Sequence, residues 1–141
     1  MPTRVAHDGG VNPRLTTSST PEQRTTHRAA VALAGLLLFT GSVHLVRPHV
    51  FDAALPSWLP GSRRAWALGS GVAELACAGL VGLPRTRRLG GWATAALFVA
   101  VFPGNVHMVS TAETPQARAV TLARLPLQVP LVLWALRAAR P

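Results

Sequence analysis

The chain has 141 residues, which allows one domain, and 49% of them are hydrophobic while only 13% are charged. This balance is typical of a membrane protein and argues against an ordinary soluble domain. The formal net charge of +9 comes from arginine alone, because the sequence contains no lysine, and the arginines stand mainly between the apolar runs. We therefore expect contact with lipid headgroups and no binding of nucleic acid. The single cysteine, Cys77, excludes an internal disulfide.

Residues 1–27 are rich in Thr, Ser, Pro and Arg and show no helical or strand periodicity, which predicts a disordered cytoplasmic tail. No apolar core of a secretory signal precedes Ala29. Residues 28–141 are predicted to form one membrane domain with four helices. These are expected at about 29–46, 65–83, 89–109 and 119–136. The predicted fold is an all-α, integral membrane four-helix bundle with up-down-up-down topology.

The first predicted helix carries His44 and Arg47 at its end. The loop that follows contains several apolar residues spaced as one face, but Pro56 and Pro60 prevent a continuous helix. We expect this interfacial loop to lie along the membrane surface with Trp58 as its anchor.

The second predicted helix is an apolar run long enough to cross a bilayer, yet it carries a carboxylate, Glu74, near its middle. Leu68, Val72 and Leu75 lie on the side opposite Glu74, which predicts that this side faces lipid. The protein-facing stripe consists of Ala67, Ser70, Gly71, Glu74, Cys77 and Ala78. An unpaired ionised group at membrane depth costs about 2.5 to 3.5 kcal/mol, so Glu74 needs a partner, a proton or a water-filled cavity.

A turn of five residues, PRTRR, makes the second and third helices an antiparallel pair. Pro103 and Gly104 are expected to kink or unwind the last turn of the third helix. The backbone groups freed there would be satisfied inside the bundle, near Asn105 and His107. The fourth helix presents a polar stripe, made of Thr121, Arg124 and Gln128.

The arginine distribution predicts the orientation. If the N-terminus is inside, nine arginines lie on the cytoplasmic side and five lie toward the outside. The nine are Arg4, Arg14, Arg24, Arg28, Arg85, Arg87, Arg88, Arg137 and Arg140, and the five are Arg47, Arg63, Arg64, Arg118 and Arg124. We expect a multi-pass protein of the cell membrane with both termini in the cytoplasm.

This orientation places polar residues from all four helices in the outer half of the membrane. The predicted polar pocket consists of His44, Arg47, Glu74, Asn105, His107, Arg124 and Gln128. We expect it to open outward beneath the Trp58 loop, with Glu74 paired to Arg124. Glu74 is then either a functional group, as a proton carrier or ligand group, or a structural one, as an ion-pair partner or protonated hydrogen-bond donor. No metal site is predicted, because His44 and His107 have no second pair of ligands close by.

Five short motifs follow one another within residues 33–136. They are G-x-x-H with a following proline and phenylalanine (Gly41, His44, Pro48, Phe51), LPSWLP, S-G-x-x-E (Ser70, Gly71, Glu74), FPGN-V-H-M and R-L-P-L-Q (Arg124 to Gln128). In this order they resemble the DoxX-like family of small membrane proteins. Gly104 departs from the alanine expected before the asparagine, which would affect how freely that turn bends. The resemblance implies a four-helix membrane bundle and no particular catalytic residue; some relatives are associated with quinone-linked oxidation of sulfur compounds or with membrane redox complexes.

Three functions stay open at this level. The first is an accessory or quinone-interacting subunit of a membrane redox system, in which His44, Glu74 and Arg124 hold a quinone oxygen and move protons. The second is a small-molecule or lipid transporter gated at Pro103 and Pro126, although no inverted repeat is present. The third is a noncatalytic assembly partner.

The sequence contains no nucleophile with its base, no phosphate-binding loop and no two-thiol centre, so a stand-alone enzyme is not expected. Whether the chain is an oxidoreductase subunit stays open, and quinone is the one cofactor considered. The expected partners are the lipid bilayer, other membrane redox subunits and a second copy of the chain.

Overall fold

A computed structural model describes residues 20–140, so most of the predicted tail lies outside the described residues. The described part of the chain is helical and contains no strand. Its elements are α1 (Pro21–Val46), the short 3-10 helix η1 (Pro48–Ala54), α2 (Arg63–Gly82), α3 (Arg87–Ala100), α4 (Phe102–Ser110) and α5 (Pro115–Ala138).

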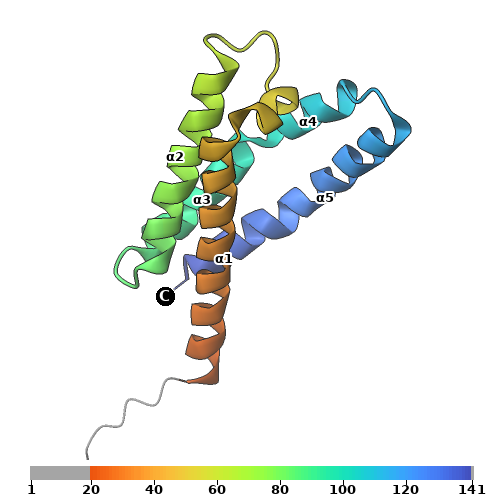
Figure 1. Cartoon of the computed structure of the whole chain (residues 1–141). Coiled ribbons are helices and arrows are strands. Elements are labelled where there is room, and N and C mark those ends of the chain that lie inside the picture. The colour runs from red at the N-terminus through yellow and green to blue at the C-terminus, as the bar shows by residue number, and fades with distance from the viewer. Residues whose placement is uncertain (1–19, 141) are drawn as a thin grey trace, which may run out of the picture.

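Four helical spans are long and apolar enough to cross a membrane, with α3 and α4 together forming the third, Arg87–Ser110. They run alternately up and down, and the start of α1 and the end of α5 lie at the same end of the bundle (Figure 1). The predicted all-α membrane four-helix bundle is therefore confirmed. We call the end that carries the start of α1 the terminal end, and the opposite end the η1 end.

The first helix begins eight residues earlier than predicted, at Pro21 instead of Ala29. Thr20 caps it, because the Thr20 hydroxyl accepts from the Gln23 backbone N–H while the Gln23 side chain accepts from the Thr20 backbone N–H. This reciprocal capping box and a proline at the first helical position are strong start signals. Residues 21–27, predicted as part of a disordered tail, are therefore helical.

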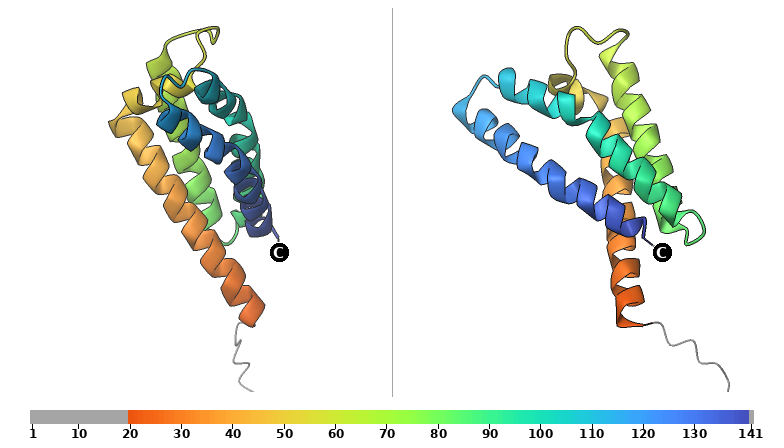
Figure 2. Two further views of the ribbon diagram at one scale, coloured as in Figure 1. Left: turned by 90° about the vertical axis from the view of Figure 1, so that its right-hand side faces the viewer. Right: turned by 180° about the vertical axis from the view of Figure 1, so that it is seen from behind.

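The third span is broken at Val101, two residues before Pro103. A proline ring has no N–H to donate and fits within the first turn of a helix, so α4 begins where α3 cannot continue. The predicted kink is thus present, but it lies about two turns from the end of the span and divides it into two helices. Beyond the break, α4 and α5 lean away from α1 and α2 at the η1 end (Figures 1 and 2).

The bundle core is made of small and aliphatic side chains from α1, α2, α3 and α5, including Leu33, Leu37 and Val81. The predicted protein-facing stripe of α2 is largely confirmed, since its small members Ala67, Gly71, Cys77 and Ala78 are all buried. Val72, predicted to face lipid, is 60% exposed.

Helices α1 and α2 are held close by two glycines that stand opposite the two ionisable residues. A Cβ added at Gly41 would lie 3.1 Å from the Cβ of Glu74, and one added at Gly71 would lie 2.8 Å from the Cβ of His44. Each glycine therefore makes room for the polar residue of the other helix. In both helices the glycine precedes the polar residue by three positions, so one spacing repeated in antiparallel helices produces the reciprocal fit.

The loop helix η1 packs across the η1 end of α1, α2 and α4. A Cβ added at Gly104 would lie 2.7 Å from the carbonyl oxygen of Ala54, so only glycine lets η1 approach α4 this closely. The absence of a side chain at Gly104 is thus explained by packing against η1, whereas the sequence alone suggested an effect on the bending of the turn.

Replacing Gly71 by alanine is expected to destabilise the bundle by about 1 to 3 kcal/mol, because the new methyl group meets His44 and the backbone of α1. Gly69→Ala is the matched control, since no atom lies within 4 Å of its added Cβ and alanine favours a helix. Equilibrium unfolding in mixed detergent, followed by circular dichroism, measures both. Equal shifts in the two variants would contradict the close approach.

Candidate functional site

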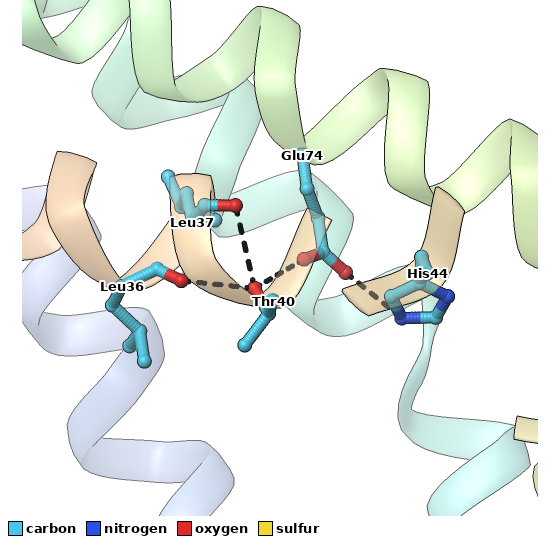
Figure 3. Close-up of polar contacts among 5 residues, drawn as sticks. All are labelled: Leu36, Leu37, Thr40, His44 and Glu74. Atoms are coloured by element: carbon cyan, nitrogen blue, oxygen red, sulfur yellow. Dashed lines mark hydrogen bonds and ion pairs between the residues drawn. The ribbon is translucent and has the colours of Figure 1, made fainter. Parts of the chain in front are cut away.

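An acid and a base meet between α1 and α2 inside the membrane-spanning region. His44 Nε2 lies 3.3 Å from Glu74 Oε1, and the two side chains are only 13% and 12% exposed (Figure 3). His44 belongs to α1 and Glu74 to α2, so no local turn brings them together and only the packing of α1 on α2 joins them. This pair is the candidate functional site.

Thr40 extends the pair on the side away from His44. Its hydroxyl contacts Glu74 Oε2 and also lies 3.0 Å from the backbone carbonyl oxygen of Leu36 (Figure 3). Thr40 was not among the predicted site residues, although it precedes His44 by one helical turn and so shares its face. That spacing is the signal that could have identified it.

Phe51 of η1 covers His44 on one side. The two rings are stacked, with centroids 3.4 Å apart and planes inclined by 11°. The other ring nitrogen of His44, Nδ1, is buried near the Ala67 backbone and has no partner with hydrogen-bond geometry. The imidazole is therefore held by one polar partner and one aromatic face, and its second nitrogen is unsatisfied.

The contacts of Thr40 define what the cluster can do with a proton. A hydroxyl has one hydrogen, so Thr40 donates either to the Glu74 carboxylate or to the Leu36 carbonyl. In the first arrangement Glu74 is ionised and a protonated His44 balances its charge. In the second, a protonated Glu74 donates to Thr40, Thr40 donates to Leu36, and His44 is neutral.

Both arrangements have no net charge, which is the condition that a low-dielectric environment favours. They also use the same heavy-atom positions. The His44–Glu74–Thr40 cluster can therefore hold one proton at either side of Glu74 without a change of conformation.

A second polar cluster lies between α3, α4 and α5 and is built around the buried amide of Gln128. Its Oε1 accepts from Asn105 Nδ2 at 3.0 Å, and its Nε2 donates to the backbone carbonyl of Phe98. Phe98 lies in the last turn of α3, where the break leaves carbonyls without helical partners. The expectation that freed backbone groups are satisfied near Asn105 is confirmed for the Phe98 carbonyl, which accepts from Gln128.

The predicted pair of Glu74 with Arg124 was wrong. Glu74 contacts His44 and Thr40, while Arg124 is exposed on α5. The reason lies in the tilt of α5, which is joined to α1 near the terminal end, where Trp134 Nε1 donates to the Ala29 carbonyl at 3.0 Å. Toward the η1 end α5 leans away with α4 (Figure 1).

The remaining predicted residues lie apart from both clusters. Arg47 is exposed at the C-terminal cap of α1, and His107 is half-buried on α4. Among residues 20–140 neither side chain makes a hydrogen bond or ion pair with another residue. Trp58 is 71% exposed, and its role as a membrane anchor stays a prediction. The seven predicted residues thus form two separate pairs and three single residues.

An apolar groove of about 430 Å³ lies between the third span and α5. Its lining includes Val99, Phe102, Val129 and Val132, and the only polar residue is Gln128. In the part of the chain that the structure describes, no group of three or more His, Cys, Asp or Glu side chains could hold a metal ion.

Glu74→Leu and His44→Leu are each expected to destabilise the protein, because each leaves the other side chain buried without its partner. The double variant should cost less than the sum of the two, with a coupling of about 1 to 2 kcal/mol, because an apolar pair replaces an ionisable one. Unfolding free energies in mixed detergent measure the coupling. Strictly additive effects would contradict the pair, and Glu113→Leu, at an exposed loop position, serves as the uncoupled control.

Gln128→Leu is expected to destabilise the protein by about 1 to 2 kcal/mol, because it removes both hydrogen bonds that join α5 to α3 and α4. Once Gln128 is absent, adding Asn105→Leu should cost little more. Gln116→Leu, at an exposed position on the same helix, is the control. A Gln128→Leu variant as stable as this control, in the same unfolding measurement, would show that the amide does not join the helices.

Comparison with known proteins gives a match to a family model that covers most of the bundle. No curated protein and no solved structure matches the chain. Residues 33–139 match the family model described as "Domain of unknown function (DUF8561)". This segment includes both polar clusters and all four membrane spans except the first turns of α1. Since it is well over half of the sequence, the chain belongs to the DUF8561 family.

Proposed function

We propose that the protein is a quinone-interacting accessory subunit of a membrane redox system, in which the His44–Glu74 pair takes up and releases a proton. The single observation that carries this proposal is the His44–Glu74–Thr40 cluster. A bundle that needed only stability would be served as well by apolar side chains, because a buried ionisable pair seldom stabilises more than the hydrophobic residues that could replace it. Ionisable residues inside membrane spans are most often functional for this reason.

Quinone is the class of ligand whose chemistry matches a pair that holds a proton. Quinone reduction takes up protons and quinol oxidation releases them, so a nearby group that holds a proton without net charge is useful in either direction. The electrons would come from, or go to, another subunit, since nothing among the described residues resembles a redox centre of its own. The resemblance of the five motifs to the DoxX-like family, in which some relatives are linked to quinone chemistry, supports the same class.

The proposed setting is the cell membrane, with both termini in the cytoplasm. Supporting this, the two described ends of the chain lie at one end of the bundle, together with Arg24, Arg28, Arg85, Arg87, Arg88, Arg137 and Arg140. An excess of arginine marks the cytoplasmic side of membrane proteins. In this orientation the His44–Glu74 pair lies in the outer half of the membrane and exchanges its proton on that side.

A lipid or small-molecule transporter is the second candidate, and one observation favours it. The groove of about 430 Å³ between the third span and α5 is apolar, and it lies beside the helix break at Val101. A groove of this kind suits an acyl or isoprenoid chain. Its only polar group, Gln128, is however already engaged by Asn105 and Phe98.

The test uses the full chain purified in an uncharged detergent and a benzoquinone with a decyl tail. A ligand that binds the folded state raises the unfolding temperature, so the quinone should raise it for the unaltered protein. Glu74→Gln keeps the shape of the side chain but cannot ionise, and it should abolish the shift. Glu113→Gln, which removes an exposed carboxylate, should keep it.

The same preparation separates the alternatives. No shift in the unaltered protein, or an equal shift in both variants, would contradict a quinone site at the pair. Transfer of a fluorescent phospholipid between the leaflets of liposomes that contain the protein, lost on filling the groove with Val129→Trp, would instead support the transporter.

A further inference from the structure

The terminal end of the bundle carries a cavity that neither polar cluster uses. It has a volume of about 400 Å³ and lies between the start of α3 and the end of α5. Its lining consists of Arg88, Trp92, Leu136, Ala139 and Arg140. Two cations and a large aromatic side chain thus surround one cavity at an end of a membrane bundle.

The order of residues along the two helices gives the cavity a polarity. On α3, Arg88 precedes Trp92 by one helical turn. Leu136 lies in the last turn of α5, and Arg140 follows just beyond the end of that helix. The third span and α5 run in opposite directions (Figure 1). From their places in the sequence, both arginines therefore lie toward the terminal end and both apolar side chains lie one turn deeper. The cavity is therefore basic at its outer rim and apolar toward the middle of the membrane.

A close helix contact holds the two sides of the cavity together. A Cβ added at Gly91 would lie 2.7 Å from the Ala135 carbonyl oxygen and 2.7 Å from the Ala139 Cβ, so α3 and α5 touch at this glycine. Gly91 lies between Arg88 and Trp92 in the sequence, and Ala139 directly precedes Arg140. The position of the two arginines relative to each other is thus set by backbone packing.

The two arginines are available for a ligand. The neighbouring Arg87 is engaged, since its Nε donates to the Val81 carbonyl at 3.2 Å and its Nη2 lies 3.2 Å from His27 Nδ1. Arg88 and Arg140 are exposed, and within residues 20–140 their guanidinium groups make no hydrogen bond or ion pair. The cavity lining contains no acidic residue to neutralise them.

We infer that this cavity binds one anionic glycerophospholipid, with the phosphate between Arg88 and Arg140 and an acyl chain along Trp92 and Leu136. Guanidinium groups bind phosphate oxygens through paired hydrogen bonds. Tryptophan is favoured at the level of the headgroups, where its ring is partly apolar and partly polar. Basic pockets between membrane helices are suited to anionic headgroups. Here Trp92 and Leu136 also supply an apolar surface for an acyl chain. This site is independent of the proposed quinone chemistry and lies on other helices than the His44–Glu74 pair.

Native mass spectrometry of the full chain in an uncharged detergent tests the site, with dioleoylphosphatidylglycerol and dioleoylphosphatidylcholine as probes. The first phosphatidylglycerol should bind more tightly than phosphatidylcholine. In the Arg88→Gln, Arg140→Gln variant its affinity should fall about thirtyfold, because each arginine beside an anionic lipid contributes roughly a factor of five. Phosphatidylcholine binding should change little.

The matched control is Arg85→Gln, Arg137→Gln, which removes the same charge from exposed positions at the same end of the bundle. It should retain most of the affinity for phosphatidylglycerol, and equal losses in the two double variants would overturn the site in favour of diffuse charge attraction. Trp92→Ala should lower the affinity for phosphatidylglycerol severalfold, although both arginines are intact. No effect of Trp92→Ala, together with full competition by inorganic phosphate, would instead show a site for free phosphate. Unchanged helicity and unfolding temperature verify that the variants fold.

Discussion

The bundle depends on placing one acid and one base at membrane depth and keeping them together. This requires α1 and α2 to approach until the side chains of His44 and Glu74 meet, and any side chain at Gly41 or Gly71 would prevent it. The glycines are therefore as much a part of the cluster as the ionisable groups. With the helices this close, the two side chains are largely buried, and Phe51 of η1 covers one face of the imidazole.

The two polar clusters of the bundle differ in kind. The Gln128 amide uses its oxygen for Asn105 and its nitrogen for the Phe98 carbonyl, in an arrangement that has a single sensible assignment of hydrogens. The cluster around Glu74 has two assignments of equal net charge, and an unsatisfied nitrogen besides. The first cluster compensates for a broken helix. The second can hold its proton in two ways, which stability of the bundle does not require. This difference makes Glu74 the functional candidate and gives the Gln128 amide a structural role.

Properties that depend on local sequence could be predicted. The four spans follow from runs of apolar residues, the antiparallel pairing of the second and third spans follows from a short turn, and the buried face of α2 follows from the spacing of its small residues. The start of α1 also depends on a local signal, the capping box at Thr20 and Gln23. Because these residues are polar, they were predicted to be part of the tail.

The partner of Glu74 was not predictable in the same way. His44 and Arg124 were both expected in the same half of the membrane as Glu74, so expected depth alone does not distinguish between them. The choice depends on the tilt of α5, which follows from contacts made far away, at Trp134 and Gly91. Asn105 and Gln128 were predicted to share the pocket of Glu74, but they pair with each other, and this joint role follows from a helix break whose position differs from the expected one.

The short helix η1 has a consequence for how the two halves of the molecule respond to each other. Through Phe51 it rests on His44, and through Ala54 it rests on Gly104, three residues beyond the break in the third span. The acid–base cluster and the amide cluster share no side chain, yet η1 packs against His44 of the first and against Gly104, the chain neighbour of Asn105 in the second. We therefore expect the two clusters to be energetically coupled. A shift at the break in the third span would reach the His44 imidazole through η1.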